Sequence, residues 1–239
     1  MKRTILWSIV VLAFLSAGYS VQATTWDVAA DFSETNNPNG AWSYGWSSTL
    51  VSPSAPDINL YTKSGKFDDT INPIIPVDVW AGSNFPYSPN VAHNGTGSIN
   101  NDHPTIVWQP GQFSLHPGDN GEYSYARWIA PYAGTFDIAA TFTGIDENGS
   151  TTDVHVLHNG NSLFYKWINL NEFGNTVLFP KTTVSVNMDD KIDFAVGYGN
   201  GAHTCDTTAL SATISIPEPA TLLLLGLGGM AIRKVRGKR

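Results

Sequence analysis

Apolar and polar residues alternate through the second half of the chain, from about residue 111 to residue 216. The clearest stretch is residues 135–143, where every second residue is apolar and most of the others are threonine or aspartate. An extended strand places successive side chains on opposite faces, so this pattern predicts a strand with one face in a core and the other in water. The apolar members are Phe136, Ile138, Ala140 and Phe142.

Further alternating stretches follow, with turn residues between them. Residues 153–157 and 162–168 flank Asn159-Gly160, a dipeptide typical of tight hairpins. Antiparallel sheets that face water on one side produce this alternation. We therefore predict an all-β fold, a β-sandwich that is jelly-roll-like, with an immunoglobulin-like sandwich as the second choice. Residues 33–105 are rich in Asn, Pro, Ser and Gly, and there we expect a few strands joined by long surface loops.

The two ends of the chain have a different character from the middle. Lys2 and Arg3 precede an apolar stretch, and small residues precede a cleavage point after Ala23, the pattern of a secretory signal peptide. The short apolar run and the cleavage point argue against the alternative, an uncleaved N-terminal anchor. We expect residues 1–23 to form an N-terminal signal helix that signal peptidase removes.

At the other end, Pro217-Glu218-Pro219 precedes an apolar run of 13 residues and a final seven residues of which five are basic. As a helix this run covers about 20 Å, against a membrane core of roughly 30 Å. We expect a short transmembrane helix that would span the membrane only with help from its neighbours, which suits a segment that is later removed. The basic tail would stay cytoplasmic, with the domain outside. The alternative, a buried element that ends a soluble domain, fits poorly with this basic tail.

This arrangement of residues 216–239 resembles the PEP-CTERM sorting signal. The resemblance implies an exported protein that is held briefly in the inner membrane and is cut by an exosortase near Pro217, Glu218 and Pro219. It implies delivery to the cell surface or extracellular matrix, in association with extracellular polymeric substance and biofilm. The exported domain would then be residues 24–216, whose best-patterned part is residues 111–216. Within it, residues 128–136 resemble a strand-turn-strand unit of galactose-binding-like jelly rolls.

The charge of the exported part narrows its partners. Residues 24–216 contain six basic and nineteen acidic residues, a net charge of about −13. This charge argues against nucleic acid or anionic lipid as a partner and permits calcium binding. Cys205 is the only cysteine, so the chain has no internal disulfide, and Asp206 beside it opposes thiolate formation.

Aromatic residues are the first candidates for ligand contact. Trp42, Tyr44 and Trp46 alternate, so one strand places all three on one face. Flat rings on a solvated sheet face bind sugar rings, but large aromatics are more often buried, and we favour the core for this stripe. If the domain binds carbohydrate, we expect the contact residues to be Trp42, Trp46, Trp80 and Trp108.

Calcium is the second candidate. Asp146, Asn148 and Asp153 lie in an oxygen-rich loop between two predicted strands, and calcium prefers such ligands. The order of the residues is not that of an EF-hand, and a solvated turn is the reading we favour. Structural calcium is common in galactose-binding-like modules, so the resemblance adds some support. The histidines are scattered along the chain without metal-ligand spacing.

The sequence has no nucleophile elbow, phosphate-binding loop or dinucleotide fingerprint. We predict a non-enzymatic exported protein with a structural or adhesive role and carbohydrate binding, sorted through its C-terminal segment. The alternative is a polysaccharide hydrolase or lyase on a jelly-roll scaffold. That alternative predicts acids that converge in a cleft, whereas the first predicts exposed aromatic rings without such a pair. A third reading, a purely structural surface-layer protein, predicts neither.

Overall fold

The computed structural model describes residues 24–54, 56–67, 75–82, 88–168, 173–199 and 202–217. In these residues the chain forms β-strands and no helix. The strands are β1 (Thr25–Asp27), β2 (Trp42–Ser47), β3 (Asn59–Leu60), β4 (Lys63–Phe67), β5 (Ile75–Ala81), β6 (Asn90–His93), β7 (Phe113–His116), β8 (Tyr123–Ile129), β9 (Gly134–Gly144), β10 (Asp153–His158), β11 (Asn161–Trp167), β12 (Thr176–Val186), β13 (Lys191–Gly197) and β14 (Thr208–Ser215).

Residues Thr25–Pro219 form one compact unit. The second unit, Met1–Thr24 with Ala220–Arg239, lies outside the described residues apart from Thr24. The predicted signal helix, the cleavage point at Ala23 and the predicted C-terminal transmembrane helix all lie outside the described residues. Within the described part of the chain, no helix has the length and apolar character needed to cross a membrane.

Strands β7 to β14 build a jelly roll. One sheet contains β7, β14, β9 and β12 in that order, and the other contains β8, β13, β10 and β11. The neighbouring strands in these two sheets are antiparallel, and the chain crosses from one sheet to the other after every strand except β10, which β11 follows in the same sheet. This winding confirms the predicted fold class. The strands of the jelly roll lie within residues 111–216, the best-patterned part of the sequence.

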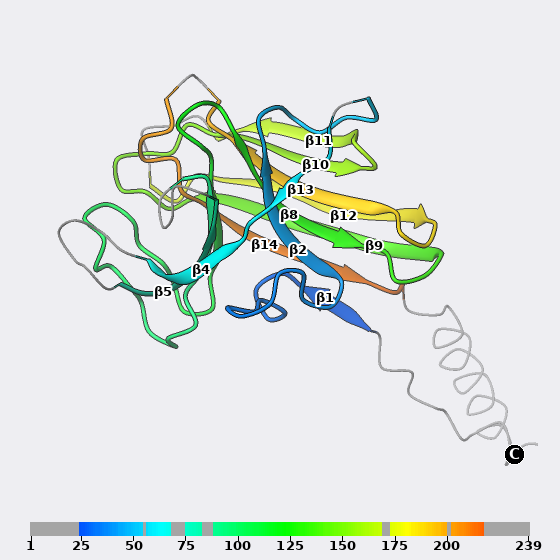
Figure 1. Cartoon of the computed structure of the whole chain (residues 1–239), viewed down its shortest axis with the longest axis horizontal. Helices are drawn as coiled ribbons and strands as arrows, with labels where there is room; N and C mark the ends of the chain where they lie inside the picture. Colours follow the sequence, from blue (N-terminus) through cyan, green and yellow to red (C-terminus); the bar gives the residue numbers. More distant parts are fainter. Residues whose placement is uncertain are drawn as a thin grey trace, which may run out of the picture. The chain divides into compact units, whose positions relative to one another are not determined.

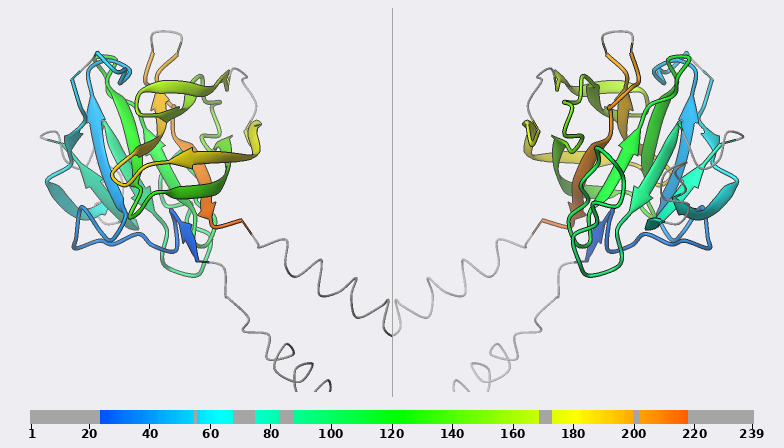
Figure 2. Two further views of the ribbon diagram at one scale, coloured as in Figure 1. Left: turned by 90° about the vertical axis from the view of Figure 1, so that its right-hand side faces the viewer. Right: turned by 90° about the vertical axis from the view of Figure 1, so that its left-hand side faces the viewer.

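The first half of the chain widens both sheets. Strands β6, β5 and β4 extend the first sheet beyond β7, and β2 and β3 extend the second sheet beyond β8. Figure 2 shows the strands gathered in two facing layers. The weakly patterned residues 33–105 therefore complete the sandwich, with strands joined by long loops.

The core lies between the two sheets and is rich in aromatic rings. Trp128 makes edge-to-face contacts with Trp26 and Phe136, at ring-centroid distances of 5.4 Å and 5.1 Å. Tyr44 packs on Phe113 at 5.4 Å. Such pairs add about 0.5–1.5 kcal/mol each to the burial of their apolar surface. With no disulfide available, this core holds the domain together.

The hairpin between β10 and β11 has the predicted turn. Asn159 and Gly160 adopt left-handed conformations with φ of 50° and 76°, as a type I′ turn requires. A Cβ atom on Gly160 would lie 2.6 Å from the carbonyl carbon of Ser52. Glycine is therefore required here for the turn and for the close approach of the neighbouring loop.

That loop covers the middle of the second sheet's outer face. Val51 packs with Tyr125, Leu157 and Ala195 in a separate small cluster, and its N–H donates to the Tyr125 hydroxyl at 2.9 Å. Strand β11 lies beyond this cover, at the edge of the sheet. Its outer face consequently remains exposed.

The sandwich has two distinct ends. Thr25 of β1 pairs with Ser215 of β14, so the first and last strands meet at one end, which we call the terminal end (Figure 1). The opposite, distal end holds the start of β14 at Thr208, which pairs with Gly144 of β9 and Leu115 of β7. Eight strand residues separate the two ends along β14, a span of about 25 Å.

Candidate functional site

Three of the four tryptophans expected to contact a ligand are core residues. Trp42 is 1% exposed, Trp80 is 6% exposed and Trp108 is 0% exposed. Each indole N–H is bonded inside the protein: to the Asp31 carboxylate, to the Ser33 carbonyl and to the Ser114 hydroxyl, respectively. The contact role expected for these three residues is therefore corrected. Trp42 on β2 and Trp80 on β5 point into the main core, as favoured for the stripe that begins at Trp42. Trp108 lies outside the named strands and is part of a second buried cluster.

Trp46 is placed differently. It is half-buried, packs against the core and lines a pocket of about 280 Å³ together with Gly82, Asp119 and Glu122. It is the one residue of the four whose side chain borders open space. The structure thus separates Trp46 from the other three.

An exposed row of large side chains lies on β11. Leu163, Tyr165 and Trp167 are 38%, 47% and 42% exposed. They alternate with Phe164, which packs against the core, so all three lie on the outer face. We call Leu163, Tyr165 and Trp167 the β11 row. The alternation of large side chains after Asn159-Gly160 is visible in the sequence, but alternation alone does not show which face of the strand stays uncovered.

The rings of the β11 row are held by their neighbours. Tyr165 stacks on His155 of β10 with ring centroids 5.0 Å apart and an angle of 31° between the planes. Trp167 lies edge-on to Tyr165 at 6.2 Å. A Cβ atom on Gly199 would lie 2.6 Å from Cζ3 of Trp167, so the indole rests directly against the Gly199 backbone. These contacts fix the orientation of both exposed rings.

A buried hydrogen-bond network lies behind the row. The Asp153 carboxylate accepts from the Tyr123 hydroxyl at 2.9 Å and from the Gly199 N–H at 2.9 Å, and its Oδ2 atom lies 2.8 Å from Nε2 of His155. Burial alone would raise the pKa of Asp153, but the hydrogen bonds from His155 and Tyr123 outweigh it and hold the pKa below its usual value. Asp153 therefore stays ionised and anchors His155 beneath Tyr165.

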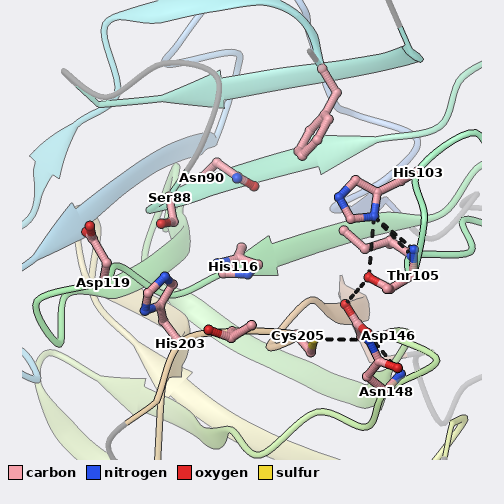
Figure 3. A pocket seen from close by; sticks show the side chains of 13 residues that line it. Ser88, Asn90, His103, Thr105, His116, Asp119, Asp146, Asn148, His203 and Cys205 are labelled. Atoms are coloured by element: carbon pink, nitrogen blue, oxygen red, sulfur yellow. Dashed lines mark hydrogen bonds between the residues drawn. The ribbon is translucent and has the colours of Figure 1, made fainter. Parts of the chain in front are cut away.

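A pocket of about 560 Å³ opens at the distal end, and we call it the distal pocket. Asp146 follows β9, His116 ends β7, and Cys205 precedes β14, so the ends of three strands of one sheet meet there (Figure 3). Phe67, His103 and His203 also line it. Trp108 lies behind this wall, 5.5 Å from the Phe67 ring and 6.3 Å from the His103 ring.

Neutral donors fix the Asp146 side chain in this pocket. It is 2% exposed and accepts from the Thr105 hydroxyl at 2.9 Å and from the Asn148 N–H at 3.0 Å. Figure 3 shows the Thr105 contact together with His103, whose Nδ1 accepts from the Thr105 N–H at 3.2 Å. Burial raises the pKa of the Cys205 thiol. The thiol therefore stays protonated, which opposes a role as a nucleophile.

Asp206 lies fully buried near both sites. Its Oδ1 accepts from the Thr151 N–H at 2.7 Å, while its Oδ2 has no hydrogen-bond partner. Burial raises the pKa of Asp206 to about 6, and the charges of Asp146 and Asp153 add to the rise. Asp206 therefore titrates much closer to neutral pH than an ordinary aspartate does.

The residues expected to bind calcium do not gather at one point. Asp146 and Asn148 line the distal pocket, whereas Asp153 is engaged in the network behind the β11 row. Among the described residues, no group of three or more His, Cys, Asp or Glu side chains is arranged to hold a metal ion. A structural calcium stays a prediction.

The residues of the expected sorting motif follow β14. Pro217 is the last described residue, while Glu218 and Pro219 lie outside the described residues. Pro217 comes two positions after Ser215, which is paired with Thr25. The two expected processing points, after Ala23 and near Pro217, therefore adjoin the same end of the sandwich.

Three solved structures illustrate what the fold is similar to. CBM51 from Clostridium perfringens GH95 in complex with methyl-galactose is 11% identical, covers 81% of this chain and 100% of its own, and has a TM-score of 0.36. A family 35 carbohydrate binding module from Clostridium thermocellum is 14% identical, with coverages of 50% and 78% and a TM-score of 0.27. The K3 adhesin domain of Lys-gingipain from Porphyromonas gingivalis is 14% identical, with coverages of 44% and 74% and a TM-score of 0.31.

No curated protein matches the chain. Residues 215–239, about a tenth of it, match the PEP-CTERM protein-sorting motif. This match confirms the resemblance found at Pro217-Glu218-Pro219. The C-terminal segment thus indicates an exported protein that is sorted by an exosortase.

Proposed function

We propose that the exported domain is a non-enzymatic carbohydrate-binding protein that holds neutral polysaccharide at the cell surface or in the extracellular matrix. The observation that carries the proposal is the β11 row, where Tyr165 and Trp167 expose almost half of their surface on a rigid strand. Exposed aromatic rings in a fixed orientation are typical of binding surfaces, and sites on strands are held more precisely than sites on loops.

The row suits the chemistry of sugars. The apolar face of a sugar ring packs on an indole or phenol ring, and the Tyr165 hydroxyl and the Trp167 N–H supply hydrogen bonds at the ring edges. The net charge of about −13 on residues 24–216 disfavours acidic polysaccharides. A neutral polymer is therefore the expected partner, and its retention at the surface is the adhesive role.

Sorting completes the proposal. Signal peptidase cuts after Ala23, the C-terminal segment holds the protein in the inner membrane for a time, and an exosortase then cuts near Pro217. The two cleavage points, after Ala23 and near Pro217, adjoin the terminal end of the sandwich. Trp167 pairs with Asp153 at the distal end, so the Trp167 end of the row lies away from the segment through which the protein is sorted.

Binding to insoluble polymers tests the proposal. The full-length chain in mild detergent is mixed with microcrystalline cellulose, chitin, insoluble starch and an alginate gel, and the bound fraction is measured. We expect binding to at least one neutral polymer and none to alginate. Trp167→Ala should weaken that binding about tenfold, equivalent to about 1.4 kcal/mol. Tyr132→Ala is the matched control, because Tyr132 is 44% exposed but lies near Trp26 and Phe136, away from β11.

The alternative of a hydrolase or lyase is tested in the same samples. Asp119 and Asp146 both line the distal pocket, and two acids at one bond are sufficient for glycoside cleavage. Release of new reducing ends from a bound polymer, abolished by Asp146→Asn, would overturn the non-enzymatic role. Equal binding by the wild type, Trp167→Ala and Tyr132→Ala would remove the β11 row from the function.

A further inference from the structure

The distal pocket contains carboxylates, and the basic groups of its lining are the imidazoles of His103, His116 and His203. Asp146 is buried with two neutral donors, and Asp119 lies on another part of the lining (Figure 3). No lysine or arginine is among the described residues that line the pocket. A buried carboxylate without a cationic partner is costly, and such groups are normally paired.

Most lysine and arginine residues of the domain pair with carboxylates outside the pocket. Residues 24–216 contain only six. Four of them pair with carboxylates that do not line the pocket: Lys66 with Asp78, Arg127 with Asp193, Lys181 with Asp137 and Lys191 with Asp57. None of the ion pairs among the described residues joins Asp146 to a lysine or arginine, so a bound cation can supply the counter-charge of Asp146.

The histidine at the end of β7 does not supply that charge. His116 Nδ1 donates to the Pro117 carbonyl at 2.7 Å, which leaves the proton on Nδ1 and the lone pair on Nε2. Burial lowers the pKa of His116 to about 4, so the ring stays neutral. Its Nε2 makes no hydrogen bond with the described part of the chain and is an acceptor for a hydroxyl group.

The pocket is shaped for an organic molecule rather than for a metal ion. Its volume of about 560 Å³ lies in the range of small-molecule sites. A metal ion would need several ligands within one coordination shell, and no such group exists among the described residues. An organic ammonium group, in contrast, can be paired by a single carboxylate, and the other polar groups of the same molecule can bond to the rest of the lining.

We propose that the distal pocket binds a protonated amino sugar. Its ammonium group pairs with the Asp146 carboxylate, and one of its hydroxyls donates to Nε2 of His116. The remaining lining carries hydroxyl and amide groups, such as those of Ser88, Asn148 and Thr204, which suit a polyhydroxylated ring. The choice of a sugar among organic amines rests on the proposed function, whereas the demand for a cation rests on the pocket alone.

Titration calorimetry on the full-length chain in mild detergent at pH 7 tests this proposal. The probes are glucosamine, N-acetylglucosamine, glucose and glucuronate. We expect glucosamine to bind at least tenfold more tightly than the other three, because only its amino group is free and charged. Asp146→Asn should lower glucosamine affinity at least tenfold. The matched control is Glu147→Gln, which removes the same charge from an exposed neighbour outside the pocket lining.

Two further variants keep the test clear. Asp119→Asn changes an exposed residue of the lining and should lower affinity several-fold without affecting folding. Trp167→Ala should leave glucosamine binding unchanged, because the β11 row is not part of the pocket lining. If the wild-type chain binds polymer but not glucosamine, the amino-sugar site is refuted while the proposed function stands. Equal affinity for glucosamine and glucose, or equal losses in Asp146→Asn and Glu147→Gln, would also overturn it.

Discussion

The indole ring of Trp167 lies against the backbone of Gly199, which also donates its N–H to the Asp153 carboxylate at 2.9 Å. One residue of the loop after β13 therefore orients an exposed ring and a buried carboxylate. Gly199 has a φ of 55°, a conformation that side-chain-bearing residues seldom adopt. Glycine at position 199 therefore permits both the left-handed backbone conformation and the close approach of the Trp167 ring.

Substitution of Gly199 by alanine tests this relationship. The added Cβ would displace the indole, so we expect Gly199→Ala to weaken polymer binding about as much as Trp167→Ala does. The left-handed conformation adds a loss of stability of about 1–2 kcal/mol. The added Cβ would also lie too close to the Thr151 carbonyl oxygen, which adds to this loss. Gly174→Ala is the matched control, because Gly174 has a φ of 82° with nothing within 4 Å of its Cβ position. Similar binding losses in both variants would attribute the effect to backbone strain.

The buried Trp42 should matter for stability and not for ligand contact. Trp42→Ala removes a large ring from the centre of the core, which typically costs about 3–5 kcal/mol. We expect a lower midpoint of denaturant unfolding and unchanged affinity of the molecules that remain folded. The milder Trp42→Phe keeps enough folded protein for the binding assay. Reduced binding at unchanged stability would restore Trp42 as a contact residue.

Asp206 should make stability depend on pH. Because burial raises its pKa from 3.8 to about 6, the folded state holds the proton more tightly than the unfolded state does. The contribution of Asp206 to the unfolding free energy should therefore fall as pH rises from about 4 to about 6, by at most about 3 kcal/mol. His116, whose pKa is lowered to about 4, contributes with the opposite sign over the same window, so the Asp206 contribution is read from a difference between two proteins. Asp57 and Asp190, whose pKa values are lowered to about 2, titrate below this window.

Asp206→Asn isolates this effect. The amide oxygen can still accept the hydrogen bonds from Thr151, while the charge is absent at every pH. We expect the variant to gain stability relative to the wild type between pH 4 and pH 7, measured by urea unfolding at several pH values. A constant difference between the two proteins across this range would show that Asp206 does not titrate there.

The ion pair under the loop at Val51 should be a strong determinant of stability. Arg127 donates to both oxygens of Asp193, at 2.6 Å and 2.9 Å, and Asp193 is fully buried. Asp193→Ala leaves the guanidinium without its main partner, and we expect a loss of about 3–5 kcal/mol in urea unfolding. Glu34→Ala, in an exposed pair with Lys66, should cost less than about 1 kcal/mol. Equal losses would contradict this assignment.

The jelly roll was predictable where local and global patterns agree. Residues 135–143 alternate cleanly because β9 lies between β12 and β14 in its sheet and has one face in the core. Residues 33–105 lack such a signal, because their short strands join the two sheets through long-range pairing and their loops dominate the composition. The pairing of Thr25 with Ser215 spans almost the whole domain. No local pattern encodes such a contact.

The candidate sites were harder to predict. Alternation identified the face that Trp42 shares with Tyr44, but not whether that face would be covered. The outer face of β11 stays exposed because the loop at Val51 packs only on residues of β8, β10 and β13. The distal pocket brings together His103, His116, Asp146 and Cys205 from four separate segments. Their proximity follows from the winding of the strands and leaves no trace in sequence spacing.

The pairing of β14 also has a mechanical consequence. A polymer bound at the Trp167 end of the β11 row and an attachment beyond Pro217 would pull on opposite ends of the sandwich. The load would then run along β14, which is paired with β9 over eight residues and with β7 and β1 over three residues each. Antiparallel hydrogen bonds lie across the strand axis, so these bonds would be loaded together in shear rather than broken one after another. The domain is built to resist being unravelled from its own C-terminus.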